Sequence, residues 1–307
     1  MTGPIPFIDA HVHYWQLDRL RYGWLTRPFA SEGPNGDVSG IASDYGPADH
    51  RSEAADWTLI GAVHVEAGAH PDEALAETDW LTDLAADQGS PDAMVAHAAL
   101  DAPDVATLLA DQAARPRVRG IRHIVNWHPD PRRSYTAHDV TGDAAWQRGF
   151  ALLADHGFSF DLQAYPAQFA TLARMIERHP DVPVFINHAG MGLDGEAEWL
   201  VGLEALAKLP HVAIKLSGLG FAIRPWDAGK ARDRVRRAID VFGVDRAMMA
   251  SDFPTDRLFA SFDATMGMLH AATEDLTSSE RRALFAGNAN RLYRMGVDPR
   301  RLQGEAA

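Results

Sequence analysis

Eight short apolar segments, separated by stretches with helical periodicity, constrain the fold more than any other feature of this chain. Their β-branched and aliphatic residues are typical of buried strands. The candidate strands are Phe7–His13, Thr58–Glu66, Ala93–Leu100, Gly120–Asn126, Ser159–Tyr165, Val184–His188, Val212–Ser217 and Ala247–Asp252. Alternating strands and helices favour an α/β fold with parallel strands. Eight such units in 307 residues predict a (β/α)8 barrel.

The segments between the strands carry apolar residues at helical spacing. After the fifth strand, Phe169, Leu172 and Ile176 share one helical face, and similar spacing precedes the fifth, seventh and eighth strands. A doubly wound open sheet is the alternative architecture. No G-x-G-x-x-G motif follows the first strand, which weakens the dinucleotide-binding version of that fold.

Two longer stretches interrupt this rhythm, and both follow a strand. Residues 14–56 form a long insertion after the first strand, and residues 127–142 form a shorter one after the fourth. In a barrel both leave the C-terminal face, where active sites lie, so we expect the first to be an active-site loop. We find no linker and expect one domain across residues 1–307, with a frayed tail at 299–307.

Charge and composition exclude several classes of function. The chain has 29 Lys+Arg against 42 Asp+Glu, a net charge of -13, so it lacks the basic footprint of a nucleic-acid binder. It has no Cys, and no apolar run is long enough to span a membrane. Charged and imidazole groups occupy residues 1–15, where a secretory leader would be apolar. We therefore expect a cytoplasmic protein without nucleic-acid or membrane partners; a homo-oligomer remains open.

Ionisable residues stand near the C-terminal ends of three candidate strands. His11 and His13 are two residues apart on the first strand and share one face of it. His188 ends the sixth strand and Asp252 ends the eighth. Barrel closure brings the first and eighth strands together, so we expect these four side chains to converge.

Each of these residues also has a structural interpretation when taken alone. Paired strand histidines can simply be hydrogen-bonded, and an Asp after a strand is often a turn former or a helix cap. Ionisable side chains at the ends of buried strands are costly unless they are paired. Their placement at matching depth on three strands therefore favours a site.

Seven short motifs carry a resemblance to a known family. They are FIDAHVHYWQ, YGWL, GIRHIV, INHAG, KLSG, SDFP and FAGNANRLY. The chain resembles the amidohydrolase superfamily, and within it the amidohydrolase-2 branch of lactonases that use one metal ion or none. That branch includes sugar-acid lactonases and 2-pyrone-4,6-dicarboxylate lactonases. The resemblance runs from about residue 5 to residue 295.

The resemblance implies roles for the strand-end residues. His11 and His13 match the first-strand pair of the superfamily, His188 matches a later histidine, and Asp252 matches the carboxylate that deprotonates the attacking water. The chain lacks the bridging Lys of two-metal members. We therefore expect either no metal or a single divalent ion, with zinc favoured, bound by His11, His13, Asp252 and His188 or a subset of them.

Further polar and aromatic residues are candidates for substrate binding. Arg122 could clamp a carboxylate or polarise a carbonyl, although a surface ion pair, or an inward-facing His123 in its place, is the alternative. Lys215 could supply a cation, or it could be a barrel residue buried against an acidic side chain. The aromatic candidates for the pocket walls, which could instead only pack the loops, are Trp15, Tyr22, Trp24 and Trp127.

These observations predict a hydrolase that opens a lactone, with a sugar-acid lactone of carbohydrate metabolism as the expected substrate. Asp252 would activate water, while the histidines and Arg122, or a metal, would stabilise the oxyanion. A metal-dependent decarboxylase of an aromatic or muconate-type acid is the alternative enzyme. A barrel that only binds a ligand is the non-enzymatic alternative.

Overall fold

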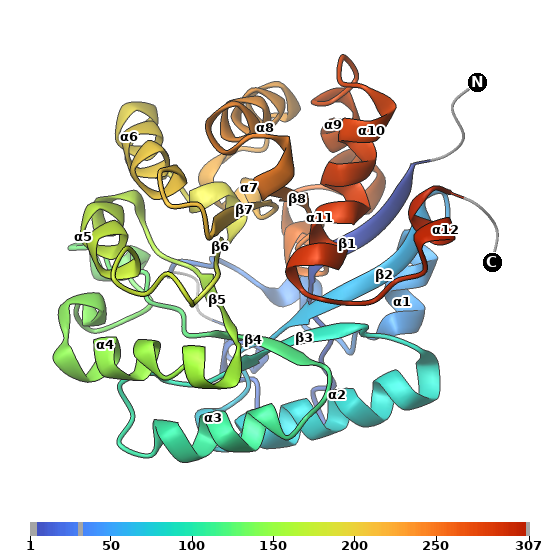
Figure 1. Ribbon diagram of the computed structural model, residues 1–307. Helices are drawn as coiled ribbons and strands as arrows, with labels where there is room; N and C mark the ends of the chain where they lie inside the picture. The colour runs from blue at the N-terminus through green and yellow to red at the C-terminus, as the bar shows by residue number, and fades with distance from the viewer. Residues whose placement is uncertain (1–4, 30–32, 305–307) are drawn as a thin grey trace.

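The computed structural model describes residues 5–29 and 33–304 of the chain. In these ranges eight parallel strands form one sheet in the order β1 to β8 (Figure 1). The strands are β1 Pro6–Val12, β2 Thr58–Val65, β3 Ala93–His97, β4 Val118–Arg122, β5 Ser159–Leu162, β6 Val184–Ile186, β7 Val212–Leu216 and β8 Ala247–Met249. The sheet curls until β8 contacts β1, which confirms the predicted (β/α)8 barrel.

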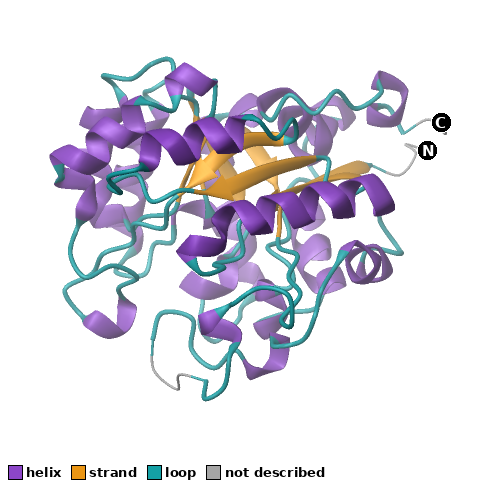
Figure 2. Ribbon diagram, turned by 90° about the horizontal axis from the view of Figure 1, so that it is seen from below, coloured by secondary structure: helices purple, strands orange, loops and turns teal. Residues whose placement is uncertain are grey.

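Helices surround the strands on the outside of the barrel, as the view from below makes clear (Figure 2). Within the described residues they are α1 Pro47–Glu53, α2 Ala74–Gln88, α3 Val105–Ala113, α4 Ala144–Ala151, α5 Pro166–Ile176, α6 Glu196–Ala207, α7 Leu219–Ala222, α8 Ala228–Phe242, α9 Phe262–Ala271, α10 Ser278–Arg282, α11 Asn288–Leu292 and α12 Pro299–Leu302. No helix in this part of the chain combines the length and apolar character needed to cross a membrane.

The helices form where the sequence supplies an apolar face and a start or stop signal. In α5, Phe169, Leu172 and Ile176 are buried against the sheet, as their spacing predicts. The Asp227 side chain begins α8 by accepting a hydrogen bond of 3.0 Å from the backbone N–H of Lys230. Gly243, at a φ of 75°, ends it.

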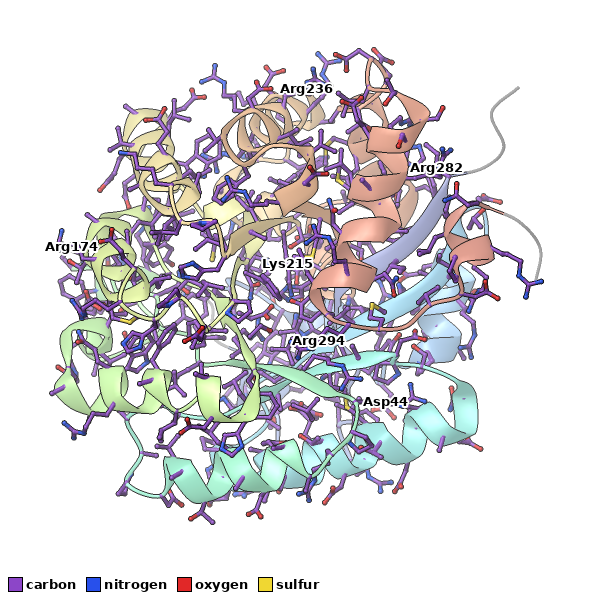
Figure 3. All side chains as sticks on the ribbon, viewed as in Figure 1. Asp44, Arg174, Lys215, Arg236, Arg282 and Arg294 are labelled. Atoms are coloured by element: carbon purple, nitrogen blue, oxygen red, sulfur yellow. The ribbon has the colours of Figure 1, made fainter. Side chains whose placement is uncertain are left out.

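The barrel interior is filled by side chains rather than open. Small and branched residues such as Ala10, Val63 and Val95 pack around Phe185. Beside them Lys215 is fully buried and forms an ion pair with Asp161, and Figure 3 places it within the barrel. Packed side chains below and a site above are the usual division of such a barrel.

The strands are shorter at their C-terminal ends than the sequence predicts. β6 ends at Ile186 and β8 at Met249, so His188 and Asp252 lie in the loops that follow. Both residues adopt left-handed backbone conformations, with φ of 54° and 60°. An L-residue at positive φ cannot continue a strand, and such strain clusters at functional sites.

Two segments outside the barrel strands contain short helices. In the tail, for which we predict fraying from residue 299, Pro299–Leu302 forms α12. Asp298 caps this helix, and the Arg301 guanidinium donates to the Ile60 carbonyl over 2.8 Å. The final residues, 305–307, lie outside the described residues. The predicted insertion at 14–56 contains α1, and its residues 30–32 lie outside the described residues.

Candidate active site

The site is built on the seam where β1 meets the segment that follows β8. The Asp252 N–H donates to the His11 carbonyl and the His13 N–H donates to the Phe253 carbonyl, both over 2.8 Å. These two bonds close the barrel and bring three ionisable residues side by side. Barrel closure thus places His11 and Asp252 in contact although more than two hundred residues separate them in the sequence.

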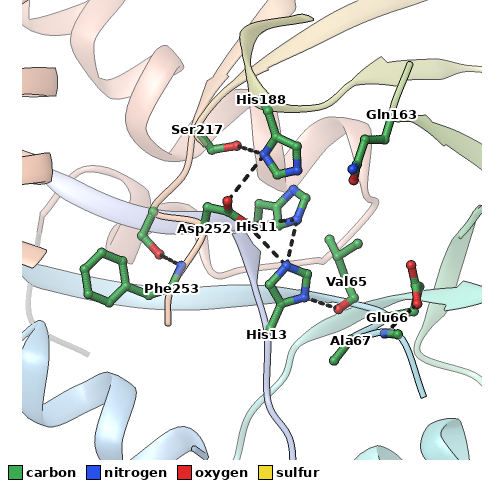
Figure 4. Close-up of polar contacts among 12 residues, drawn as sticks. His11, His13, Val65, Glu66, Ala67, Gln163, His188, Ser217, Asp252 and Phe253 are labelled. Carbon is green, nitrogen blue, oxygen red and sulfur yellow. Dashed lines mark hydrogen bonds and ion pairs between the residues drawn. The ribbon is translucent and has the colours of Figure 1, made fainter. Parts of the chain in front are cut away.

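One side-chain atom from each of His11, His13 and Asp252 could bind a metal ion, and these three atoms form a compact triangle (Figure 4). The Nε2 atoms of His11 and His13 are 3.2 Å apart. Oδ1 of Asp252 lies 3.5 Å from the first and 3.3 Å from the second. All three side chains are buried, so their polar atoms face one another with little water between them.

A backbone carbonyl determines how His13 presents its ring. Nδ1 of His13 lies 2.7 Å from the Val65 carbonyl oxygen, which can only accept. Nδ1 must therefore carry a hydrogen, and Nε2 is the ring nitrogen that faces Asp252. Burial, reinforced by the Lys215 charge, lowers the pKa of His11 well below its ordinary value, so His11 is neutral.

His188 completes the group from the loop after β6. Its Nδ1 is 3.5 Å from Oδ2 of Asp252 and 3.4 Å from the Ser217 hydroxyl. Burial lowers the pKa of His188 to about 4, which keeps the ring neutral at physiological pH. Gly218 is required here, because a Cβ atom at that position would collide with the His188 ring.

The Asp252 carboxylate is 1% exposed, yet neither of its oxygens accepts a hydrogen bond from any described residue. Its nearest polar neighbours are the three imidazoles at 3.3–3.5 Å. A buried carboxylate without hydrogen bonds is costly and is rare outside functional sites. Such a group is suited to bind a cation or to take a proton.

Arg122 reaches the same region from the end of β4. Its Nε donates to the Glu66 carboxylate over 2.6 Å, and Nη1 donates to Oε1 of Gln163 over 3.0 Å. Burial alone would raise the pKa of Glu66, but the Arg122 charge and the hydrogen bonds that Glu66 accepts hold that pKa below its usual value. His123 faces the other way and accepts from the Leu100 N–H. Of the two alternatives, Arg122 is therefore the inward residue.

A cavity of about 190 Å³ opens above these groups. Its ionisable lining residues are His13, Arg122, His188 and Asp252. The remaining walls are largely apolar or neutral. They are Trp24, Asn35, Ala67, Gly68, Ile124, Tyr135, Gln163, Met191, Phe221 and Thr255.

Four of the predicted substrate-binding residues do not line this cavity. Trp15 donates from its ring to the Ser43 carbonyl over 2.7 Å and packs edge-on behind Trp24, and the Tyr22 hydroxyl points at Glu77. Trp127 is also absent from the cavity walls. Lys215 is held beneath them by its ion pair with Asp161. The buried rings of Trp15 and Tyr22 pack the insertion onto the barrel, where a ring removed from water stabilises the fold.

Several cavity residues were not predicted from the sequence. Tyr135 and Asn35 come from the two insertions, and the Tyr135 hydroxyl donates to the Asn35 side chain over 2.6 Å, joining the loops above the site. Phe221 follows the KLSG motif. Loop residues without periodicity give no sequence signal for the direction of their side chains. The one available signal was that each lies in a segment that follows a strand.

The donor set fits a divalent metal ion. In a tetrahedral zinc site with Zn–N bonds of about 2.05 Å, two ligating atoms are about 3.3 Å apart. The three separations between His11, His13 and Asp252 are 3.2, 3.3 and 3.5 Å. Two imidazoles, and a carboxylate that accepts no hydrogen bond from the described residues, are the ligand types that zinc accepts.

Comparison with known proteins identifies the family. A family model described as amidohydrolase matches residues 8–295. The chain belongs to the amidohydrolase family. This amidohydrolase is 38% identical to the protein y4mH of Sinorhizobium fredii, over 95% of this chain and 99% of that protein. It is 30% identical to an L-fucono-1,5-lactonase of Burkholderia multivorans, over 93% and 95% of the two chains.

A solved structure gives the same result for the fold. A crystal structure of an amidohydrolase from Burkholderia multivorans with bound zinc superposes with a TM-score of 0.76 at 30% identity. The match covers 94% of this amidohydrolase and 99% of the other chain. The comparison therefore extends over the barrel and its long loops.

Proposed function

We propose that this amidohydrolase hydrolyses a lactone, and specifically a sugar-acid lactone. The observation that carries the proposal is the buried Asp252 carboxylate, which accepts no hydrogen bond from the described residues and borders a cavity lined by His13 and His188. The 30% identity to an L-fucono-1,5-lactonase supports a lactone as the substrate. Such a site suits water attack on a carbonyl.

Asp252 acts as the general base in this proposal. Its Oδ2 faces His188, and both groups border the cavity in which a lactone ring would lie. The carboxylate orients a water molecule and takes its proton as the water attacks the ring carbonyl. It then returns the proton to the alkoxide that leaves when the ring opens. Atoms balance, since one water is added and one hydroxy acid is formed.

Arg122 and His188 stabilise the charge that develops on the carbonyl oxygen. Three of the five guanidinium N–H groups of Arg122 are directed at Glu66 and Gln163, which fixes the fork in place. Its remaining donors are available to an oxyanion in the cavity that the residue lines. Fixed donors need no reorganisation in the transition state.

A zinc ion, when bound by His11, His13 and Asp252, would supply a Lewis acid that polarises the carbonyl. The imidazoles of the site are suited to hold it because burial keeps His11 neutral and the Val65 carbonyl fixes the tautomer of His13. His188 stands beside this group, in contact with the other carboxylate oxygen.

The charge of the cavity favours a neutral lactone. Arg122 is the single Lys or Arg side chain among the described lining residues, and Glu66 already balances it. A dicarboxylate or an aromatic acid would bring negative charge close to Asp252 without a free cation to offset it. Hydroxyl groups, by contrast, find neutral partners in Asn35, Tyr135 and Gln163.

A panel of aldonolactones tests the proposal with a pH indicator, with and without a chelator and added zinc. We expect acid release from neutral sugar lactones and little from 2-pyrone-4,6-dicarboxylate. Carbon dioxide release from aromatic acids, measured in parallel, tests the decarboxylase alternative. Release of carbon dioxide without lactone opening would overturn the proposal in favour of that alternative.

A further inference from the structure

A fully buried carboxylate, Asp9, lies behind the site in the seam between β1 and the segment after β8. Its Oδ1 accepts hydrogen bonds from the N–H groups of His11 and Ser251, over 3.2 and 2.9 Å. Its Oδ2 accepts from the Ser251 hydroxyl and lies 3.0 Å from Nε2 of His50. One side chain thus binds the backbone beside both a candidate metal ligand and the candidate base.

The seam is where the barrel has fewest regular hydrogen bonds. In the described part of the chain, seven neighbouring strand pairs form parallel ladders, from β1–β2 to β7–β8. β1 instead meets the segment after β8 through a single isolated bridge between Val12 and Phe253. At this place the Ser251 N–H donates to the Asp9 side chain. The carboxylate thus links the two segments where regular ladder bonds are few.

A second layer of hydrogen bonds holds Asp9 in place. His50, on α1 of the insertion, has its Nδ1 3.1 Å from the Tyr14 hydroxyl, which in turn lies 3.0 Å from the Ser90 hydroxyl. These contacts form one chain of hydrogen bonds: the Ser90 hydroxyl donates to the Tyr14 hydroxyl, Tyr14 donates to Nδ1 of His50, and Nε2 of His50 donates to Asp9. Each of these side-chain groups then has a partner. Buried networks that are fully satisfied are rigid.

We propose that Asp9, oriented by His50, is a positioning residue that sets the separation between the histidine pair and Asp252. Asp9 touches neither the cavity nor the three donor atoms, so it acts through the backbone of His11 and Ser251. The kinetic part of this inference rests on the proposed function. The metal-binding part depends only on the donor geometry.

Asp9→Asn tests the proposal directly. The amide nitrogen of Asn would face the donor groups of Ser251 or His50, so at least one of the hydrogen bonds that Asp9 accepts would be lost. Loss of such supporting contacts typically costs 10- to 100-fold in metal affinity or activity, and we expect losses of about that size in both. KM should change by less than about threefold, because the cavity walls are untouched. The visible spectrum of the cobalt-substituted protein should also shift with the donor geometry.

A variant of His50 provides a second test, which can still be carried out if Asp9→Asn does not fold. His50 lines a separate cavity of about 150 Å³, so His50→Ala opens a path from that cavity to Asp9. We expect His50→Ala to lose kcat and zinc affinity, and free imidazole to restore both. His50→Gln, whose amide can still donate to Asp9, should retain more of each. Wild-type protein with the same imidazole controls for inhibition.

Asn288→Ala is the matched control for stability alone. Asn288 donates to the Val244 and Ala247 carbonyls and so clasps the opposite end of the same strand, β8. It should lower the thermal midpoint without changing zinc affinity or kcat at temperatures well below unfolding. If Asp9→Asn and His50→Ala behave in the same way as this control, Asp9 is merely structural and the proposal is overturned.

The two proposals fail differently. A wild-type protein that binds zinc but opens no lactone would refute the proposed function, while the zinc affinities of the variants would still decide the role of Asp9. A wild-type protein that neither binds zinc nor opens a lactone would overturn both proposals, because there would be no site for Asp9 to position.

Discussion

Replacing Asp252 by Asn should move activity and stability in opposite directions. The Asn side chain keeps the size and the hydrogen-bonding capacity of Asp, but it can no longer take a proton. The substitution also removes a buried carboxylate that receives no hydrogen bond from the described residues. The first change concerns catalysis and the second concerns the energy of the folded state.

The expected magnitudes follow from the geometry. A positioned general base contributes about 10²- to 10⁴-fold, so kcat should fall by that factor, equivalent to about 2.7–5.5 kcal/mol. Each unsatisfied buried polar group costs about 1–3 kcal/mol. Because a neutral amide is less costly to bury than a carboxylate, the free energy of unfolding of the metal-free variant should rise by an amount of about that order.

The assay combines lactone hydrolysis with urea unfolding in the presence of a chelator. Asp256→Asn is a suitable control in the same loop, since Asp256 is also buried but does not line the cavity. Burial, with the Asp252 charge, raises the pKa of Asp256 well above its usual value. This makes Asp256 a poorer proton acceptor than an ordinary carboxylate. Its replacement by Asn should leave kcat nearly unchanged.

Two results would refute the reasoning. Near wild-type kcat for Asp252→Asn on a confirmed lactone would mean that Asp252 is not the base and that one of the histidines takes this role. A marked loss of stability would mean that the carboxylate is held by favourable contacts in the folded state. The imidazole distances of 3.3–3.5 Å argue against such contacts.

Three further predictions concern binding, pH and metal. Trp24→Ala should raise KM more than it lowers kcat, because the ring forms a cavity wall, whereas Trp15→Ala should mainly lower the thermal midpoint; steady-state kinetics and thermal unfolding separate the two. Burial raises the pKa of Glu77 from 4.5 to about 8, so between these values the folded chain keeps a proton that the unfolded chain releases. The free energy of unfolding should therefore fall as pH rises through this window, and urea unfolding of Glu77→Gln should show a shallower fall. Zinc at 100 times its Kd should raise the free energy of unfolding by about 2.7 kcal/mol, and the increase should disappear with a chelator or in His13→Ala.

Much of the fold could be predicted from the sequence because it depends on local periodicity. The spacing of Phe169, Leu172 and Ile176 predicts the buried face of α5, and all eight strands form where apolar segments predicted them. The strand ends were less accurate, since the chain leaves the sheet where His188 and Asp252 take positive φ. No periodic pattern encodes that departure.

The direction of the first-strand histidines depended on more than alternation. Ile8 and Ala10 pack inside the barrel, so strict alternation would send Asp9, His11 and His13 to the outside. A register shift between Asp9 and Val12 instead turns the two histidines toward the site and leaves Asp9 in the seam. The sequence predicted the shared face of the pair, but not which face it would be.

The sequence by itself determined the barrel, the candidate residues His11, His13, His188 and Asp252, and the absence of a cysteine-based chemistry. Only the tertiary structure decided that Arg122 rather than His123 faces the cavity, and that Lys215 lies beneath it in an ion pair. The physical reason is that residue type and spacing follow from local backbone geometry. The direction of a side chain at a strand end depends on competing partners that arrive from distant parts of the chain.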